Sequence, residues 1–232
     1  NLKSSVDNKT IWIYIYHIRI IGESMDLNRF LKVNNVKINN IVAKSLRYTL
    51  YLLLIIWCLT FGNLLNFDKT AVSLCLAICG ILLLIPTIFI NCLNIEKNYI
   101  MYMVIICTSL VSGVLCSFLS YYASAIVLFP LLIASLYYNR VLVLFTTLIN
   151  TAIILGSAFL NVYVGLILND PLAAGIDSAI FYNFLPKELV IIFMSFISYF
   201  IVDRNNEMMA DIFIYSQQLK ISQEEIILSF SN

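Results

Sequence analysis

The sequence predicts an all-α fold: a polytopic membrane helical bundle of six transmembrane helices with a C-terminal cytoplasmic helix. Of the 232 residues, 61% are apolar and only 12% are charged, whereas soluble domains are about 45–50% apolar and about 25% charged. The mean hydropathy is +0.92, and apolar runs of the roughly 20 residues that cross a bilayer recur along the chain. The final segment, 204–232, is more polar and contains neither glycine nor proline, which is typical of a helix outside the membrane.

The composition excludes several classes of function. A net charge of +1 gives no basic surface for nucleic acid, so the expected partner is the lipid bilayer and not nucleic acid. The chain has one histidine, His17, and its six cysteines include no C-x-x-C pair, so the spacing of a metal or redox site is missing. We therefore expect no metal, no cofactor and no catalytic residue in this chain, and interpret the cysteines as small apolar packing residues.

The first 47 residues precede the predicted membrane domain. Their apolar run is interrupted by His17 and Arg19 and is shorter than the roughly 20 residues that a span needs. We expect residues 1–24 to be a non-native upstream extension, with Met25 as the native start; a peripheral strand or interfacial segment is the alternative. Residues 25–47 have ordinary polar and basic composition and are expected to form a cytoplasmic N-terminal segment.

Residues 48–203 are predicted to form the six-span membrane domain. The fourth span contains Pro130 and is expected to be kinked or broken there, and the fifth is long enough to tilt in the bilayer. The predicted spans are 48–66, 70–90, 99–119, 121–138, 141–168 and 187–203.

Basic residues predict the orientation. With six spans, Lys97, Arg140 and Arg204 all fall on the same side as the lysines and arginine before the first span, and the opposite loops hold only Lys69 and Lys187. By the positive-inside rule, both termini are cytoplasmic. The expected location is the plasma membrane of a bacterial cell.

Charged residues between 48 and 203 all fall in loops or at the ends of the predicted spans. Because ionisable groups at membrane depth usually mark ion paths or proton relays, this pattern does not favour a transporter, a channel or an intramembrane hydrolase. The external segment 169–186 has apolar residues at four-residue intervals. It is expected to form a short amphipathic helix on the outer surface, as a plain connector or as a lid over a sensory pocket.

Small and mildly polar residues inside the spans are candidates for helix packing. Ser109, Gly113 and Ser117 recur every four residues along the third span, and small residues at this spacing let helix backbones approach closely. Asn150 lies deep in the fifth span. We expect it to bond a neighbouring helix rather than a ligand.

The tail 204–232 predicts a linker helix that continues from the sixth span. Its apolar residues follow alternating four- and three-residue steps, which is the spacing of a coiled-coil seam, although Ser222 and Ser229 also fall in it. We therefore predict a homodimer formed through this helix. The candidate seam residues are Met208, Ile212, Tyr215, Leu219 and Ile226.

The segment Gln223–Asn232 (QEEIILSFSN) resembles the helix that leads into HD-type phosphodiesterase domains, relatives of the HD-GYP cyclic-di-GMP hydrolases. The resemblance covers ten of the 232 residues. It implies a metal-dependent cytoplasmic output domain whose His and Asp ligands would lie beyond Asn232, so no catalytic residue is transferred to this chain.

We therefore expect a membrane-embedded sensory or anchoring module that relays its state through a C-terminal signalling helix to such an output domain. This chain does not decide whether the protein is an enzyme. One alternative is the input module of a histidine kinase or a diguanylate cyclase. The other is a stand-alone, transporter-like membrane protein. No recognisable pattern in the sequence identifies the stimulus.

Overall fold

The computed structural model describes residues 36–64, 69–92, 99–164 and 175–231. These residues form helices joined by short turns and include no strand, which confirms the predicted all-α class. The predicted extension 1–24 and the residues that follow it to position 35 lie outside the described part of the chain.

The helices have the following bounds. The first runs over Val36–Phe61, and the others are α2 (Lys69–Cys92), α3 (Tyr99–Leu119), the 3₁₀ helix η1 (Ser120–Leu128), α4 (Phe129–Leu136), α5 (Arg140–Val164), α6 (Ile176–Ser178), the π-helix η3 (Ala179–Phe184) and α7 (Leu185–Ser231).

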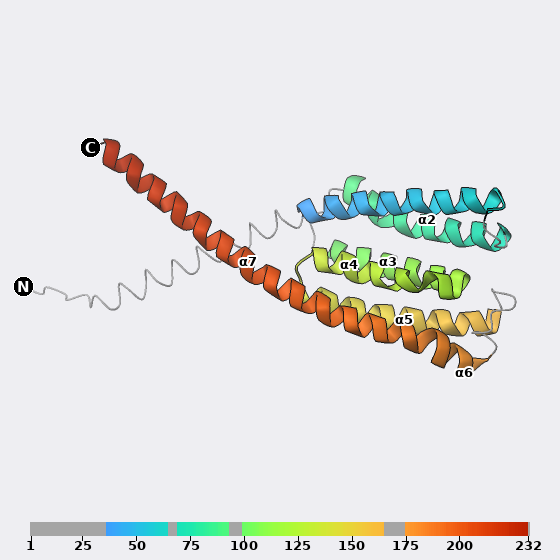
Figure 1. Cartoon of the computed structure of the whole chain (residues 1–232). Coiled ribbons are helices and arrows are strands. Elements are labelled where there is room, and N and C mark those ends of the chain that lie inside the picture. Colours follow the sequence, from blue (N-terminus) through green and yellow to red (C-terminus); the bar gives the residue numbers. More distant parts are fainter. Residues whose placement is uncertain (1–35, 65–68, 93–98, 165–174, 232) are drawn as a thin grey trace, which may run out of the picture.

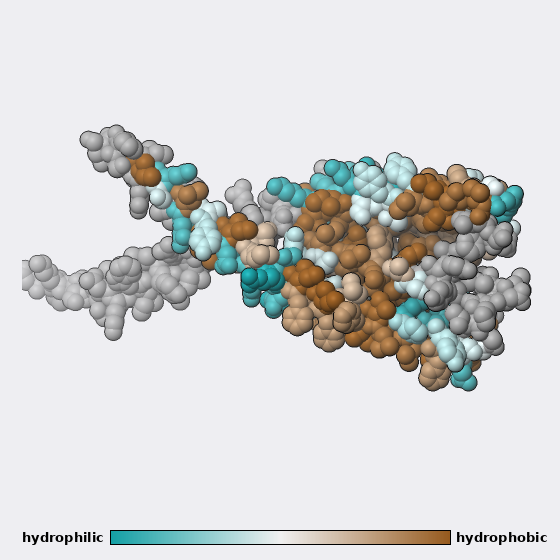
Figure 2. Space-filling view, viewed as in Figure 1, coloured by the Kyte–Doolittle hydropathy of each residue, from teal (hydrophilic) through white to brown (hydrophobic). Residues whose placement is uncertain are grey.

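Successive helices run up and down, side by side (Figure 1). α3 is central, since it packs against α2, η1, α4 and α5, and α7 packs against α4 and α5. The C-terminal part of α7 projects from the end of the bundle at which the first helix begins (Figure 1). Figure 2 shows a largely apolar surface over the bundle and hydrophilic residues where α7 leaves it.

Five described helices are long and apolar enough to cross a membrane. The predicted fourth span, 121–138, is instead η1 followed by the eight-residue helix α4. Pro130 lacks the N–H that an α-helix would offer to the carbonyl of Ile126, and the hydroxyl of Ser112 in α3 donates to that carbonyl at 3.1 Å. A 3₁₀ helix rises about 2.0 Å per residue, so η1 and α4 together extend about 30 Å, the thickness of a hydrocarbon core. The bundle thus contains five to six helical segments with the length to cross.

The first helix begins before position 48, because residues 36–47 already belong to it. Ile38, Val42 and Leu46 are buried at helical spacing, which stabilises this part against the bundle. Lys37, Lys44 and Arg47 in this stretch are exposed and lower its average hydropathy, so hydropathy alone does not show that the helix begins before position 48.

The prediction of a separate surface helix within 169–186 was also wrong. From Ile176 onward, α6, η3 and α7 follow one another without a gap, so this helix enters the bundle before the predicted start at 187. Pro186 does not end it, because the preceding turn is π-helical and the N–H of Leu185 bonds the carbonyl of Ile180. A π-turn is a common place for a helix to accommodate an irregular residue. Residues 169–174 lie outside the described part.

Candidate functional site

Contacts between α5 and α7 fix the register of these two helices. At one end Arg140 forms an ion pair with Asp203. Farther along, the hydroxyls of Thr147 and Ser195 are 2.6 Å apart. The next contact is between Thr151 and Glu188, whose Oε1 accepts a 2.8 Å hydrogen bond from the threonine hydroxyl.

This register places two ionisable residues in the middle of the bundle. Thr151 lies halfway along the 25-residue helix α5, so Glu188 is level with the centre of a bilayer-spanning helix. Glu188 is also about 22 Å along α7 from Asp203 at 1.5 Å per residue. The expectation that every charged residue lies in a loop or at a span end was therefore wrong for Lys187 and Glu188. It failed because the helix that carries them begins at Ile176 rather than after Pro186.

Lys187 is buried, with only 6% of its surface exposed. Its ammonium donates to the side-chain oxygen of Asn183, one turn earlier on the same helix. The lysine side chain therefore reaches back along its own helix to Asn183, whereas its neighbour Glu188 bonds α5 through Thr151.

Glu188 has one satisfied and one unsatisfied oxygen. Oε1 is bonded to Thr151, whereas Oε2 is buried without a hydrogen-bond partner in the part of the chain that the structure describes. An unsatisfied polar atom inside a bilayer is costly, and the free oxygen can accept a hydrogen bond from a ligand donor.

Two further polar residues of the bundle interior, Asn150 and Ser112, bond the backbone of η1. Asn150 donates from Nδ2 to the carbonyl of Val127 at 2.7 Å, next to the Ile126 carbonyl that Ser112 bonds. The Oδ1 atom of Asn150 is buried without a partner among the described residues. We refer to the whole group as the central polar cluster; its members are Ser112, Asn150, Thr151, Asn183, Lys187 and Glu188.

The residues predicted for helix packing lie mainly along α3. A Cβ atom added to Gly113 would lie 2.3 Å from Cγ2 of Ile153 in α5, so the two backbones approach closely there. Ser117 bonds the Gly113 carbonyl at 3.0 Å, and Ser109 is fully buried. Of the four predicted residues, only Asn150 belongs to the central polar cluster.

Sequence reasoning missed Lys187, Glu188 and also Asn161. Asn161 of α5 is 4% exposed, and neither its Oδ1 nor its Nδ2 has a partner among the described residues. The sequence signal that could have found Asn161 is its spacing from Asn150. About three helical turns separate the two asparagines, which places them on the same face of the helix.

The predicted seam residues lie between the middle of α7 and its C-terminal end. They are exposed on the surface of the chain: Met208, Ile212, Tyr215, Leu219 and Ile226. In the described part of the chain, no three His, Cys, Asp or Glu side chains are grouped so that they could hold a metal ion.

Comparisons with protein-family models, curated proteins and solved structures found no match. The fold and the central polar cluster are those of a multi-pass helical membrane protein with a buried lysine and a half-buried glutamate inside its bundle.

Proposed function

We propose that this chain is a sensory or anchoring membrane module that transmits a change in its bundle through α7. The observation that supports this is the continuity of α7, which carries Lys187 and Glu188 at its start and the exposed apolar seam toward its end. A helix of 47 residues is about 70 Å long. One structural element therefore links the interior of the membrane domain to a surface well outside it.

The central polar cluster is the part of the bundle best suited to bias α7. Lys187 and Glu188 bond different neighbours, Asn183 on the preceding turn and Thr151 of α5. A ligand bound at Glu188 would alter the electrostatic balance of these contacts, which are strong in a medium of low dielectric. Because α7 is helical throughout, a shift or rotation at Glu188 is carried to Met208 and beyond.

At the C-terminal end of α7, the proposed binding partner is a second copy of the tail, and the proposed output is a domain attached to the tail. The exposed apolar residues Ile212, Leu219 and Ile226 would be covered in a parallel two-stranded coiled coil. The similarity of residues 223–232 to the helix leading into HD-type phosphodiesterase domains supports a cyclic-dinucleotide phosphodiesterase as the output. A histidine kinase or diguanylate cyclase output is compatible with the same geometry.

Helical phase provides the test. One residue turns a helix by about 100°, whereas seven residues make nearly two whole turns. One alanine inserted between Asn206 and Glu207 should strongly alter the output of the protein in membranes, and seven inserted residues should largely restore it. Leu219→Glu should weaken dimerisation, with Gln218→Glu as the control for an exposed charge off the seam. Equal output from the two insertions would show that the tail is a passive tether.

The two ionisable residues inside the bundle also favour a second candidate, a transporter-like protein with an ion or proton path. Ionisable residues at membrane depth commonly mark such paths, and Glu188 carries an unpartnered oxygen among the described residues. Purified chain in liposomes with an imposed proton gradient distinguishes the candidates. Proton flux that Glu188→Gln abolishes would support transport, whereas no flux together with phase-dependent output would support the relay.

A further inference from the structure

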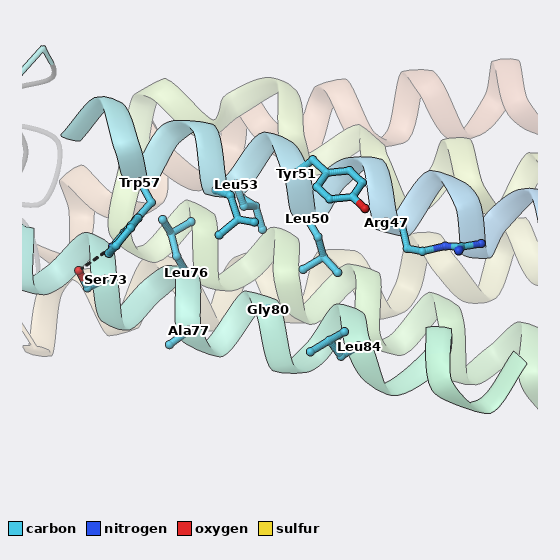
Figure 3. Close-up of a pocket in the computed structure, with 11 residues that line it drawn as sticks. Arg47, Leu50, Tyr51, Leu53, Trp57, Ser73, Leu76, Ala77, Gly80 and Leu84 are labelled. Atoms are coloured by element: carbon cyan, nitrogen blue, oxygen red, sulfur yellow. Dashed lines mark hydrogen bonds between the residues drawn. The ribbon is translucent and has the colours of Figure 1, made fainter. Parts of the chain in front are cut away.

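An apolar groove of about 600 Å³ lies between the first helix and α2 (Figure 3). Tyr51 and Leu54 on one wall and Leu84 on the other are exposed. Both helices are long and apolar enough to cross a membrane. A molecule that occupies the groove therefore comes from the bilayer rather than from water.

The groove exists because one wall is built from small residues. α2 contributes Ser73, Ala77 and Gly80, which recur at helical spacing opposite the leucines of the first helix (Figure 3). A Cβ atom at Gly80 would meet no other atom within 4 Å. Neighbouring side chains leave this space unfilled, although interiors are normally packed to the density of organic crystals.

The two ends of the groove differ in chemistry. At one end Arg47 donates from Nε to the Ala43 carbonyl at 3.3 Å, and no acidic side chain pairs with it among the described residues. At the other end the indole N–H of Trp57 donates to the hydroxyl of Ser73 at 3.2 Å. The groove thus has a cationic end and an end closed by an aromatic ring (Figure 3).

The groove extends from Arg47 toward the far ends of the two helices. Trp57 lies four residues before the first helix ends at Phe61, and Ser73 lies four residues after α2 begins at Lys69. Arg47 and Trp57 are ten residues apart on one helix, which corresponds to about 15 Å. Arg47 lies at the end predicted to be cytoplasmic, with Lys44 on the preceding turn. An arginine side chain readily reaches from an apolar surface to the interface and binds phosphate through two parallel N–H donors.

From this arrangement we infer that the groove binds one anionic phospholipid with its headgroup toward Arg47. Its phosphate is bound by the Arg47 guanidinium, and one acyl chain lies between the leucines toward Trp57. An anionic headgroup is favoured over a zwitterionic one because Arg47 is cationic and has no acidic partner among the described residues. This site is separate from the central polar cluster, so it does not depend on the proposed relay.

Tryptophan fluorescence tests the assignment. The chain has two tryptophans, Trp12 and Trp57, so Trp12→Phe leaves one reporter at the closed end of the groove. This parent variant is placed in phosphatidylcholine vesicles that contain a small fraction of lipid with brominated acyl chains, which quench tryptophan on contact. Brominated phosphatidylglycerol should quench Trp57 several-fold more than the same fraction of brominated phosphatidylcholine.

Three variants separate the headgroup from the acyl chain. Arg47→Gln should abolish the preference for phosphatidylglycerol, whereas Lys44→Gln removes an equal charge from the same exposed helix end without lining the groove and should retain most of it. Gly80→Leu fills the groove and should reduce quenching by both lipids. Ala77→Leu replaces Gly80→Leu if the latter lowers the thermal unfolding temperature in detergent.

Several results would overturn the assignment. Equal quenching by the two brominated lipids in the parent would indicate ordinary surrounding lipid only. If Arg47→Gln and Lys44→Gln changed the lipid preference equally, Arg47 would not be the residue that binds the phosphate. If inorganic phosphate competed with the lipid, no acyl chain would be required for binding. Native mass spectrometry should find one phospholipid retained per chain; a lipid-free dimer that Gly80→Leu dissociates would instead identify a second copy of the chain as the occupant.

Discussion

Ser112 of α3 donates a 3.1 Å hydrogen bond to the carbonyl of Ile126, the carbonyl that Pro130 leaves without a backbone donor. In a bilayer an unpaired carbonyl has no water to bond and costs several kcal/mol. The serine on one helix is thus the reason that the neighbouring segment can change from η1 to α4 inside the bundle.

Ser112→Ala should therefore lower stability by about 1–3 kcal/mol, the cost of an unsatisfied buried acceptor. Ser117→Ala is the matched control, because Ser117 is buried on the same helix but bonds only its own helix at Gly113. Thermal unfolding in detergent, followed by circular dichroism, measures both. If the two variants unfolded alike, the Ile126 carbonyl would not depend on Ser112.

Gly113→Ala should destabilise the contact between α3 and α5 by about 1–3 kcal/mol, because the new methyl group would overlap Ile153 and overpacking is costly. Gly156→Ala, where a Cβ meets nothing within 4 Å, should be neutral or stabilising by up to about 1 kcal/mol. The double variant Gly113→Ala with Ile153→Ala should recover part of the loss. Additive effects of the two substitutions in the same unfolding measurement would argue against direct contact.

Thr151→Val should destabilise the bundle by about 1–3 kcal/mol, since it leaves both oxygens of Glu188 without a partner at a depth where water is scarce. Glu188→Gln keeps an oxygen for Thr151 and removes the charge, so it should be at least as stable as the parent. Thr49→Val, which removes a hydroxyl bonded only to its own helix at Ser45, controls for the methyl substitution. A Glu188→Gln variant that unfolded as early as Thr151→Val would contradict this account.

Tyr137 ties the end of α4 to the first helix, since its hydroxyl donates to Oδ1 of Asn39 at 2.9 Å. Tyr137→Phe should cost about 1–3 kcal/mol because it leaves a buried acceptor unpaired. Thermal unfolding in detergent measures the loss. An unchanged unfolding temperature would show that Asn39 does not depend on the Tyr137 hydroxyl.

Reporter fusions test the predicted orientation. Fusions after Arg140 and Arg204 should report the cytoplasm, whereas a fusion after Asp177 should report the outside, because the basic residues favour the inner side. An external signal at Arg140 would mean that η1 and α4 do not cross the membrane.

The sequence by itself determined the all-α class and the approximate positions of several helices. The predicted spans 70–90 and 99–119 and the start of 141–168 lie within two residues of the corresponding limits of α2, α3 and α5. These limits are predictable because the length of an apolar run and its polar flanks are local properties of the chain.

Only the tertiary structure decided which charges are buried and which backbone irregularities are tolerated. Lys187 and Glu188 follow a proline and resemble the polar flank of a span, yet the contacts of Thr151 and Arg140 with α7 place them inside the bundle. In the broken fourth segment, the carbonyl of Ile126 likewise accepts its hydrogen bond from Ser112 of another helix. An analysis of hydropathy predicts that a span ends at a charged residue or a proline. Whether the helix actually ends there depends on partners supplied by helices that are distant in the sequence.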